Sequence, residues 1–183
     1  MNIANVENTE LTDSDLKQLL GNNINIIPYP NLKRYKSLND CFGKRNFFII
    51  FFETESALSG HWTMMLRQGN TYEYFDPYGL GIDCDKKYIE ERTLTKLKEN
   101  EPILINMCHD AISKGFTVFA NTIDYQRWSN NVGDCGRHCA VRASHANLTE
   151  LQYYNFLMQY MKDNDLSDFD ECVSEITYQV LKK

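Results

Sequence analysis

The spacing of hydrophobic and polar residues divides the chain into strand-like and helix-like segments. A continuous apolar run over residues 46–53 is long enough for a strand that is buried on both faces. Two further strands are predicted on either side of a turn at residues 68–70, over residues 61–67 and 71–76. Helical periodicity and capping residues predict the remaining elements: helices over residues 15–20, 85–99, 103–114, 149–162 and 168–182 and one from residue 135 onward, an irregular segment over 22–36 and a strand over 116–126.

Length and composition then restrict the class of protein. The 183 residues suffice for a single domain, residues 1–183, and the hydrophobic content of 43% argues against disorder. A net charge of −6, with no basic run longer than two residues, disfavours nucleic acid or an anionic membrane as the main partner. Six cysteines without a secretory leader favour a reducing compartment, and no apolar run is long enough to span a bilayer. We therefore expect a soluble intracellular monomer.

The main candidate for chemistry is Cys135, which lies where a loop gives way to a helix. Loop-forming residues precede it, and small or apolar residues at helical spacing follow it. Free backbone N–H groups and the helix dipole favour an anion at such a junction, and therefore a reactive thiolate. Gly136 would let a substrate backbone approach closely, and neighbouring N–H groups could face an oxyanion.

Three residues earlier in the chain could assist this cysteine. His61 begins the second predicted strand and Asp76 ends the third, so pairing about the turn places them nearly opposite, about 5 Å apart. Asp76 could then orient His61 as the base for Cys135. Gln126 ends the strand before Cys135 and could donate its amide to the oxyanion, with Asn130 or Asn131 as the next candidates. Each residue alone has an ordinary structural explanation; the ordered set favours catalysis.

These residues lie in segments that resemble a known family. The segments are Gly60-His61-Trp62, Tyr74-Phe75-Asp76-Pro77-Tyr78-Gly79, Gln126 and Gly133-Asp134-Cys135-Gly136. They resemble the His-Trp, Asp, Gln and Asp-Cys-Gly signatures of the SUMO-protease/adenovirus-endopeptidase superfamily of cysteine peptidases. The compact chain and the Cys-Gly-Arg-His-Cys sequence are most similar to the maturation proteases of virophages, polinton-like viruses and related large DNA viruses.

The resemblance implies an α+β fold, with a papain-like core in which helices flank a central mixed or antiparallel sheet. It implies a thiol protease without a cofactor or metal, using His61 as base, Asp76 as orienter, Cys135 as nucleophile and Gln126 as oxyanion donor. The expected activity is endopeptidase cleavage after Gly-Gly in viral capsid or core precursor proteins, in the virion and host cytoplasm. Trp62 and Trp128 are predicted to wall a cleft that only glycine can thread.

Three other interpretations remain open from the sequence. The closest is a deconjugating protease for SUMO or ubiquitin, which would also cut after glycine. A zinc module could use Cys135, His138 and Cys139, on one helical face, completed by Cys108-His109. An inactive binding module would carry an unreactive Cys135.

Overall fold

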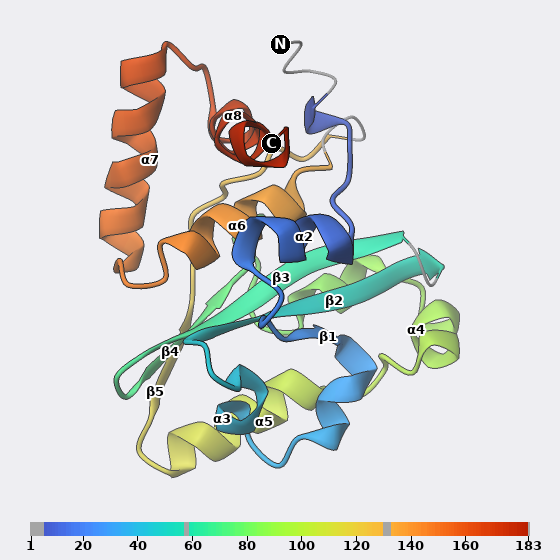
Figure 1. Ribbon diagram of the computed structural model, residues 1–183. Coiled ribbons are helices and arrows are strands. Elements are labelled where there is room, and N and C mark those ends of the chain that lie inside the picture. The colour runs from blue at the N-terminus through green and yellow to red at the C-terminus, as the bar shows by residue number, and fades with distance from the viewer. Residues whose placement is uncertain (1–5, 57–58, 130–132, 183) are drawn as a thin grey trace.

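The computed structural model describes residues 6–56, 59–129 and 133–182 and shows an α+β fold around a mixed five-stranded sheet (Figure 1). The strands follow chain order across the sheet, and β1 is parallel to β2, β2 and β3 are antiparallel, β3 and β4 are antiparallel, and β4 is parallel to β5. Their bounds are β1 Ile26–Pro28, β2 Phe47–Ser56, β3 Ser59–Gln68, β4 Thr71–Phe75 and β5 Thr117–Ala120. The expected α+β class with a mixed sheet is therefore confirmed.

Helices cover both faces of the sheet. In Figure 1, α2, α6, α7 and α8 lie on one side, and α3 and α5 lie on the other. The helical bounds are α2 Asp13–Leu20, α3 Leu38–Phe42, α4 Glu91–Leu97, α5 Ile103–Ser113, α6 Cys135–Ser144, α7 Glu150–Asn164 and α8 Phe169–Leu181, with 3-10 helices at Tyr29–Arg34 (η1) and Cys84–Tyr88 (η2). No described helix is long and apolar enough to cross a membrane.

Strand β2 explains why the sheet separates two hydrophobic cores. Phe47 and Ile49 belong to the core beneath α6, whereas Phe48, Ile50 and Phe52 belong to the core beneath α5. Successive side chains of a strand point to opposite faces, so an uninterrupted apolar run supplies both cores. The prediction of a strand buried on both faces is confirmed.

Several helix ends are set by neighbouring side chains. Thr12 and Asp15 form a reciprocal capping box at the start of α2, and Gly21 follows its end. Thr149 and Gln152 form the same box at α7, and Asp168 caps α8. Each satisfies backbone N–H groups that the first helical turn leaves free, which is why these helices begin close to where the sequence predicts.

Three predicted segments differ from the structure. The predicted helix over 85–99 is divided into η2 and α4, because Ile89 and Glu90 have extended ψ angles of 135° and 137°. The predicted strand over 116–126 is paired only over β5, and the chain then leaves the sheet. The irregular segment over 22–36 contains β1 and η1.

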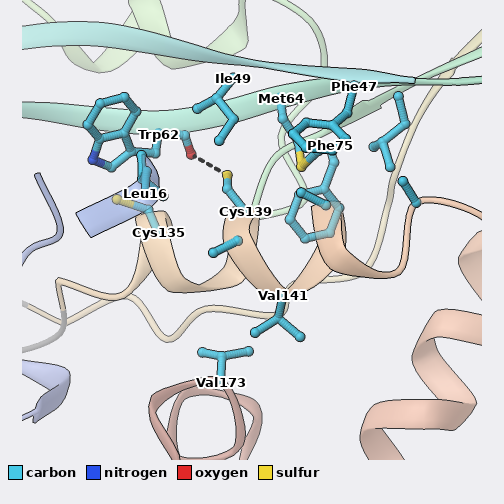
Figure 2. Packing of buried hydrophobic residues seen from close by; sticks show 14 of the residues in the cluster. Leu16, Phe47, Ile49, Trp62, Met64, Phe75, Cys135, Cys139, Val141 and Val173 are labelled. Atoms are coloured by element: carbon cyan, nitrogen blue, oxygen red, sulfur yellow. Dashed lines mark hydrogen bonds between the residues drawn. The ribbon is translucent and has the colours of Figure 1, made fainter. Parts of the chain in front are cut away.

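Helix α6 is the central helix of the upper layer. It contacts β3 on one side and α8 on the other, and all of its residues from Cys135 to Ala143 are buried. Figure 2 shows Cys139 donating its thiol hydrogen to the Trp62 carbonyl, 3.4 Å away, while Val141 points toward Val173. These contacts hold α6 between the sheet and α8.

Candidate active site

His61 and Asp76 meet at one end of the β3–β4 hairpin, where His61 Nε2 lies 2.9 Å from Asp76 Oδ1. The predicted register is wrong by two residues: Met64 pairs with Phe75, so Asp76 lies diagonally across from His61 and not opposite it. The reason is a two-residue loop, with Gln68 paired to Thr71. A shift by two keeps both side chains on one face, and diagonal neighbours remain within reach of a long side chain.

Asp76 is held in place by a residue that the sequence does not single out. Asn121, just after β5, accepts from the Asp76 backbone N–H at 2.7 Å and donates to the Asp76 carbonyl at 2.8 Å. The Tyr78 backbone N–H adds a hydrogen bond to Asp76 Oδ1 at 2.9 Å. Asn121 therefore holds the Asp76 backbone at the end of β4 in place of a strand pair, and the Tyr78 N–H holds the carboxylate. A lone asparagine after a strand carries no sequence signal of this role.

Cys135 begins α6 and lies beside His61. Burial of the imidazole lowers its pKa, but hydrogen bonds with Asp76 and Cys135 and their charges outweigh this effect and raise the pKa of His61 well above its usual value. The imidazolium is thus favoured between a carboxylate and a sulfur. Because Nε2 faces Asp76, the second ring nitrogen is the one left for Cys135.

Gln126 reaches the same place from the segment that follows β5. Gln126 is among the residues that line a cleft of about 570 Å³, together with His61 and Cys135. Its backbone N–H donates to the Pro77 carbonyl at 2.9 Å, one residue beyond Asp76. The structure therefore brings His61, Asp76, Gln126 and Cys135 together. Asn130 and Asn131 lie outside the described residues.

The predicted substrate-binding residues differ in position. Trp128 lines the cleft with 56% of its surface exposed and stacks on Tyr78 at a centroid distance of 4.1 Å. Tyr78 in turn stacks on His61 at 5.0 Å. Trp62, by contrast, is only 5% exposed and donates its indole N–H to the Leu11 carbonyl, so it is a core residue and not a cleft wall.

Gly136 is also buried, and its expected role needs correction. A Cβ at this position would lie 3.2 Å from Trp62 Cδ1 and 3.1 Å from Leu11 Cβ. The missing side chain therefore admits the Trp62 ring and the Leu11 side chain against α6, and its space is not open to a substrate. Tyr78 and Tyr88, which no sequence pattern marks as cleft residues, line the cleft instead.

The proposed zinc ligands do not assemble. Cys108 belongs to the core beneath α5, on the opposite face of the sheet from Cys135 and Cys139. His138 Nε2 lies 2.9 Å from Asp170 Oδ1. Within the described residues, no three histidine, cysteine or acidic side chains are grouped so that they could hold a metal ion.

The chain is similar in sequence to a virophage protein. No protein-family model matches the chain. It is 27% identical to uncharacterized protein V9 of Sputnik virophage over 175 residues, which cover 93% of this chain and 95% of that protein.

Solved structures with a similar arrangement are distant in sequence. The ASFV pS273R protease has a TM-score of 0.44 and 16% identity, over 97% of this chain and 69% of that one. The central domain of Lpg1148 from Legionella pneumophila has a TM-score of 0.43 and 16% identity, over 95% and 99% of the two chains. The yeast Ulp1 protease domain, solved in complex with the SUMO orthologue Smt3, has a TM-score of 0.39 and 12% identity, over 96% and 78%.

Proposed function

We propose that this protein is a cysteine endopeptidase in which Cys135 is the nucleophile, His61 the base and Asp76 the orienting carboxylate. One observation carries the proposal: His61 lies between a fully buried carboxylate and a thiol that begins a helix, and both His61 and Cys135 line the cleft. Nucleophile, base and orienting group in this order are the requirements of acyl transfer.

The reaction proceeds through a thioester. The Cys135 thiolate attacks the scissile carbonyl carbon, and the backbone N–H of Cys135 with the Gln126 side-chain amide stabilises the oxyanion. The C–N bond then breaks as His61 gives its proton to the leaving amine. A water molecule, deprotonated by His61, attacks the thioester and releases the carboxylic acid and the free thiol.

The proposed substrates are viral capsid or core precursor proteins with Gly-Gly-X sites, cut in the virion and host cytoplasm. The virophage relative supports this viral setting. The position of Cys135 supports glycine at the cut: only 7% of this residue is exposed, so a carbonyl reaches it most easily when the neighbouring residue has no Cβ. Trp128 and Tyr78 form one wall of that approach.

The test compares two leaving groups. A decapeptide with a Gly-Gly-X site and ubiquitin- and SUMO-linked substrates are incubated with the enzyme at equal concentration, with Cys135→Ala as the inactive control. We expect cleavage of the decapeptide after the second glycine and none by the variant. Much faster cleavage of the folded conjugates would replace viral maturation with deconjugation, and cleavage by Cys135→Ala would overturn the proposed nucleophile.

A further inference from the structure

A second histidine–carboxylate pair lies behind the cleft. His138 of α6 and Asp170 of α8 are both fully buried, with His138 Nε2 2.9 Å from Asp170 Oδ1. The other oxygen of Asp170 accepts two hydrogen bonds from Arg127, one from the backbone N–H at 3.0 Å and one from Nε at 2.9 Å. The proposed mechanism uses none of these three residues.

The backbone contact is the informative one, because Arg127 directly follows Gln126. The Gln126–Arg127 peptide group is held by Asp170, while the peptide group before Gln126 is held by the Pro77 carbonyl. Both peptide groups that flank Gln126 are therefore fixed, one from the C-terminal helix and one from the segment after Asp76.

His138 connects the same carboxylate to the nucleophile. It lies three residues after Cys135, within the first turn of α6. Asp170 thus contacts both the segment that carries Gln126 and the helix that carries Cys135. A single side chain therefore links these two segments, and an oxyanion donor depends on their separation to a fraction of an ångström.

We propose that Asp170 is a positioning residue for the oxyanion site: by holding the Arg127 backbone N–H and His138, it fixes the Gln126 amide relative to Cys135. The inference rests on the proposed protease function and adds a residue that touches no substrate.

The environment of Asp170 suits this role. Burial raises the pKa of its carboxyl, but the hydrogen bond and charge of His138 and the hydrogen bonds from Arg127 outweigh burial, and the pKa is lowered. An ionised acceptor makes stronger hydrogen bonds than a neutral one. The Arg127 guanidinium, whose side chain is 49% exposed, also pairs with Glu7 at 3.1 Å and Asp168 at 3.2 Å, so those two carboxylates hold the arginine without touching its backbone.

This difference supplies a matched control. Asp170→Asn weakens the hold on the Arg127 backbone, whereas Asp168→Asn removes only a contact with the guanidinium. Asn is as good a helix cap as Asp, so the capping role of Asp168 at α8 is preserved. Both variants remove one negative charge, and only Asp170→Asn changes a contact with the Gln126–Arg127 peptide.

The kinetic test is a double-mutant cycle with the Gly-Gly decapeptide. We expect Asp170→Asn to lower kcat about 10- to 100-fold with KM within about twofold, and Asp168→Asn to change kcat less than about twofold. In the Gln126→Ala background, Asp170→Asn should cost less than about threefold further, because the group that it positions is already absent. Equal losses in both backgrounds would overturn the proposal and leave Asp170 a stability residue.

A second measurement does not depend on turnover. Hydrogen exchange of the Arg127 amide should accelerate at least about tenfold in Asp170→Asn and stay unchanged in Asp168→Asn. Unchanged exchange in both variants would overturn the proposal.

If Asp170→Asn fails to fold, a backbone ester in place of the Gln126–Arg127 amide removes this N–H alone. The ester should reproduce the loss of kcat, and an ester with normal kcat would overturn the proposal. A wild-type chain that cleaves no peptide would instead refute the protease function itself.

Discussion

Two histidine–carboxylate pairs in this protein have the same separation and different surroundings. His61–Asp76 and His138–Asp170 both have an Nε2–Oδ1 distance of 2.9 Å, and both carboxylates are fully buried. The His61 side chain is 11% exposed and lines the cleft beside Cys135, whereas the His138 side chain is inaccessible. The pair itself is therefore no signature of catalysis; access to a nucleophile and to the cleft distinguishes the two.

The pairs are also built differently. His61 and Asp76 are 15 residues apart on a hairpin, where strand pairing places them on one face. His138 and Asp170 are 32 residues apart on two helices, and only the packing of α6 on α8 brings them together. A hairpin can be predicted from local pattern, but the contact between these helices cannot.

The strongest test of the comparison replaces each histidine by alanine in turn. We expect His61→Ala to lower kcat by about 10³- to 10⁴-fold with little loss of stability, because it removes the proposed base, which lines the cleft. His138→Ala should act mainly on stability, because a buried cavity and an unpaired Asp170 lower the unfolding midpoint by several degrees. Its loss of kcat should not exceed the roughly 10- to 100-fold expected for Asp170→Asn, because it removes only the link between Asp170 and α6. Peptide turnover and thermal unfolding of both variants measure this. Equal loss of activity at matched folded fraction would contradict the distinction.

The carboxylate of the cleft pair should matter less than its histidine. Asp76→Asn retains the base but removes its charge partner, so we expect a loss of kcat on the order of 10- to 1,000-fold, smaller than for His61→Ala. The pH profile of kcat/KM provides the readout. Since the Asp76 carboxylate raises the pKa of His61, the limb that reports His61 should move to lower pH in the variant. A limb at the same pH in the variant would contradict an effect of Asp76 on the pKa of His61.

The cysteines should differ in their reactivity, Cys135 from Cys139 on the same helix and from the buried cysteines elsewhere. Burial raises the pKa of Cys139 well above its usual value and that of three other thiols to about 12, namely Cys41, Cys108 and Cys172. Iodoacetamide near pH 7 should therefore label Cys135 first, at least about tenfold faster than these four. Mass spectrometry of the labelled peptides checks the order, with the partly exposed Cys84 as internal reference. Faster labelling of Cys139 would contradict the assignment.

Among the described residues, the buried carboxylate of Glu99 has no histidine partner, and its pKa differs accordingly. Glu99 is fully buried and accepts the Glu53 backbone N–H at 3.0 Å, and burial raises its pKa to about 7. A raised pKa in the folded state means that stability falls as pH rises from about 4.5 through 7. We expect Glu99→Gln to unfold about 2–6 °C above wild type at pH 8 and at the same temperature near pH 4.5. A difference independent of pH would contradict this.

What the sequence determined by itself was local. The apolar run of β2, the capping residues Thr12 and Thr149, and the placement of Cys135 at the start of a helix depend on a few consecutive residues. For the same reason His61, Asp76 and Cys135 can be proposed from the sequence, because each lies near the end of an element with a recognisable pattern, whereas Gln126 lies in the segment that follows β5.

The tertiary structure decided the contacts between distant segments. Trp62 is buried in the core, and the β3–β4 register differs from the predicted one by two residues. Asn121 holds the Asp76 backbone, and Asp170 accepts the backbone N–H of Arg127, the residue after Gln126. A side chain's partners across the molecule depend on how helices and strands pack, and no spacing along the chain encodes that packing. Whether a tryptophan walls a cleft or fills a core, and whether a histidine is reactive or structural, follows from the burial that packing imposes.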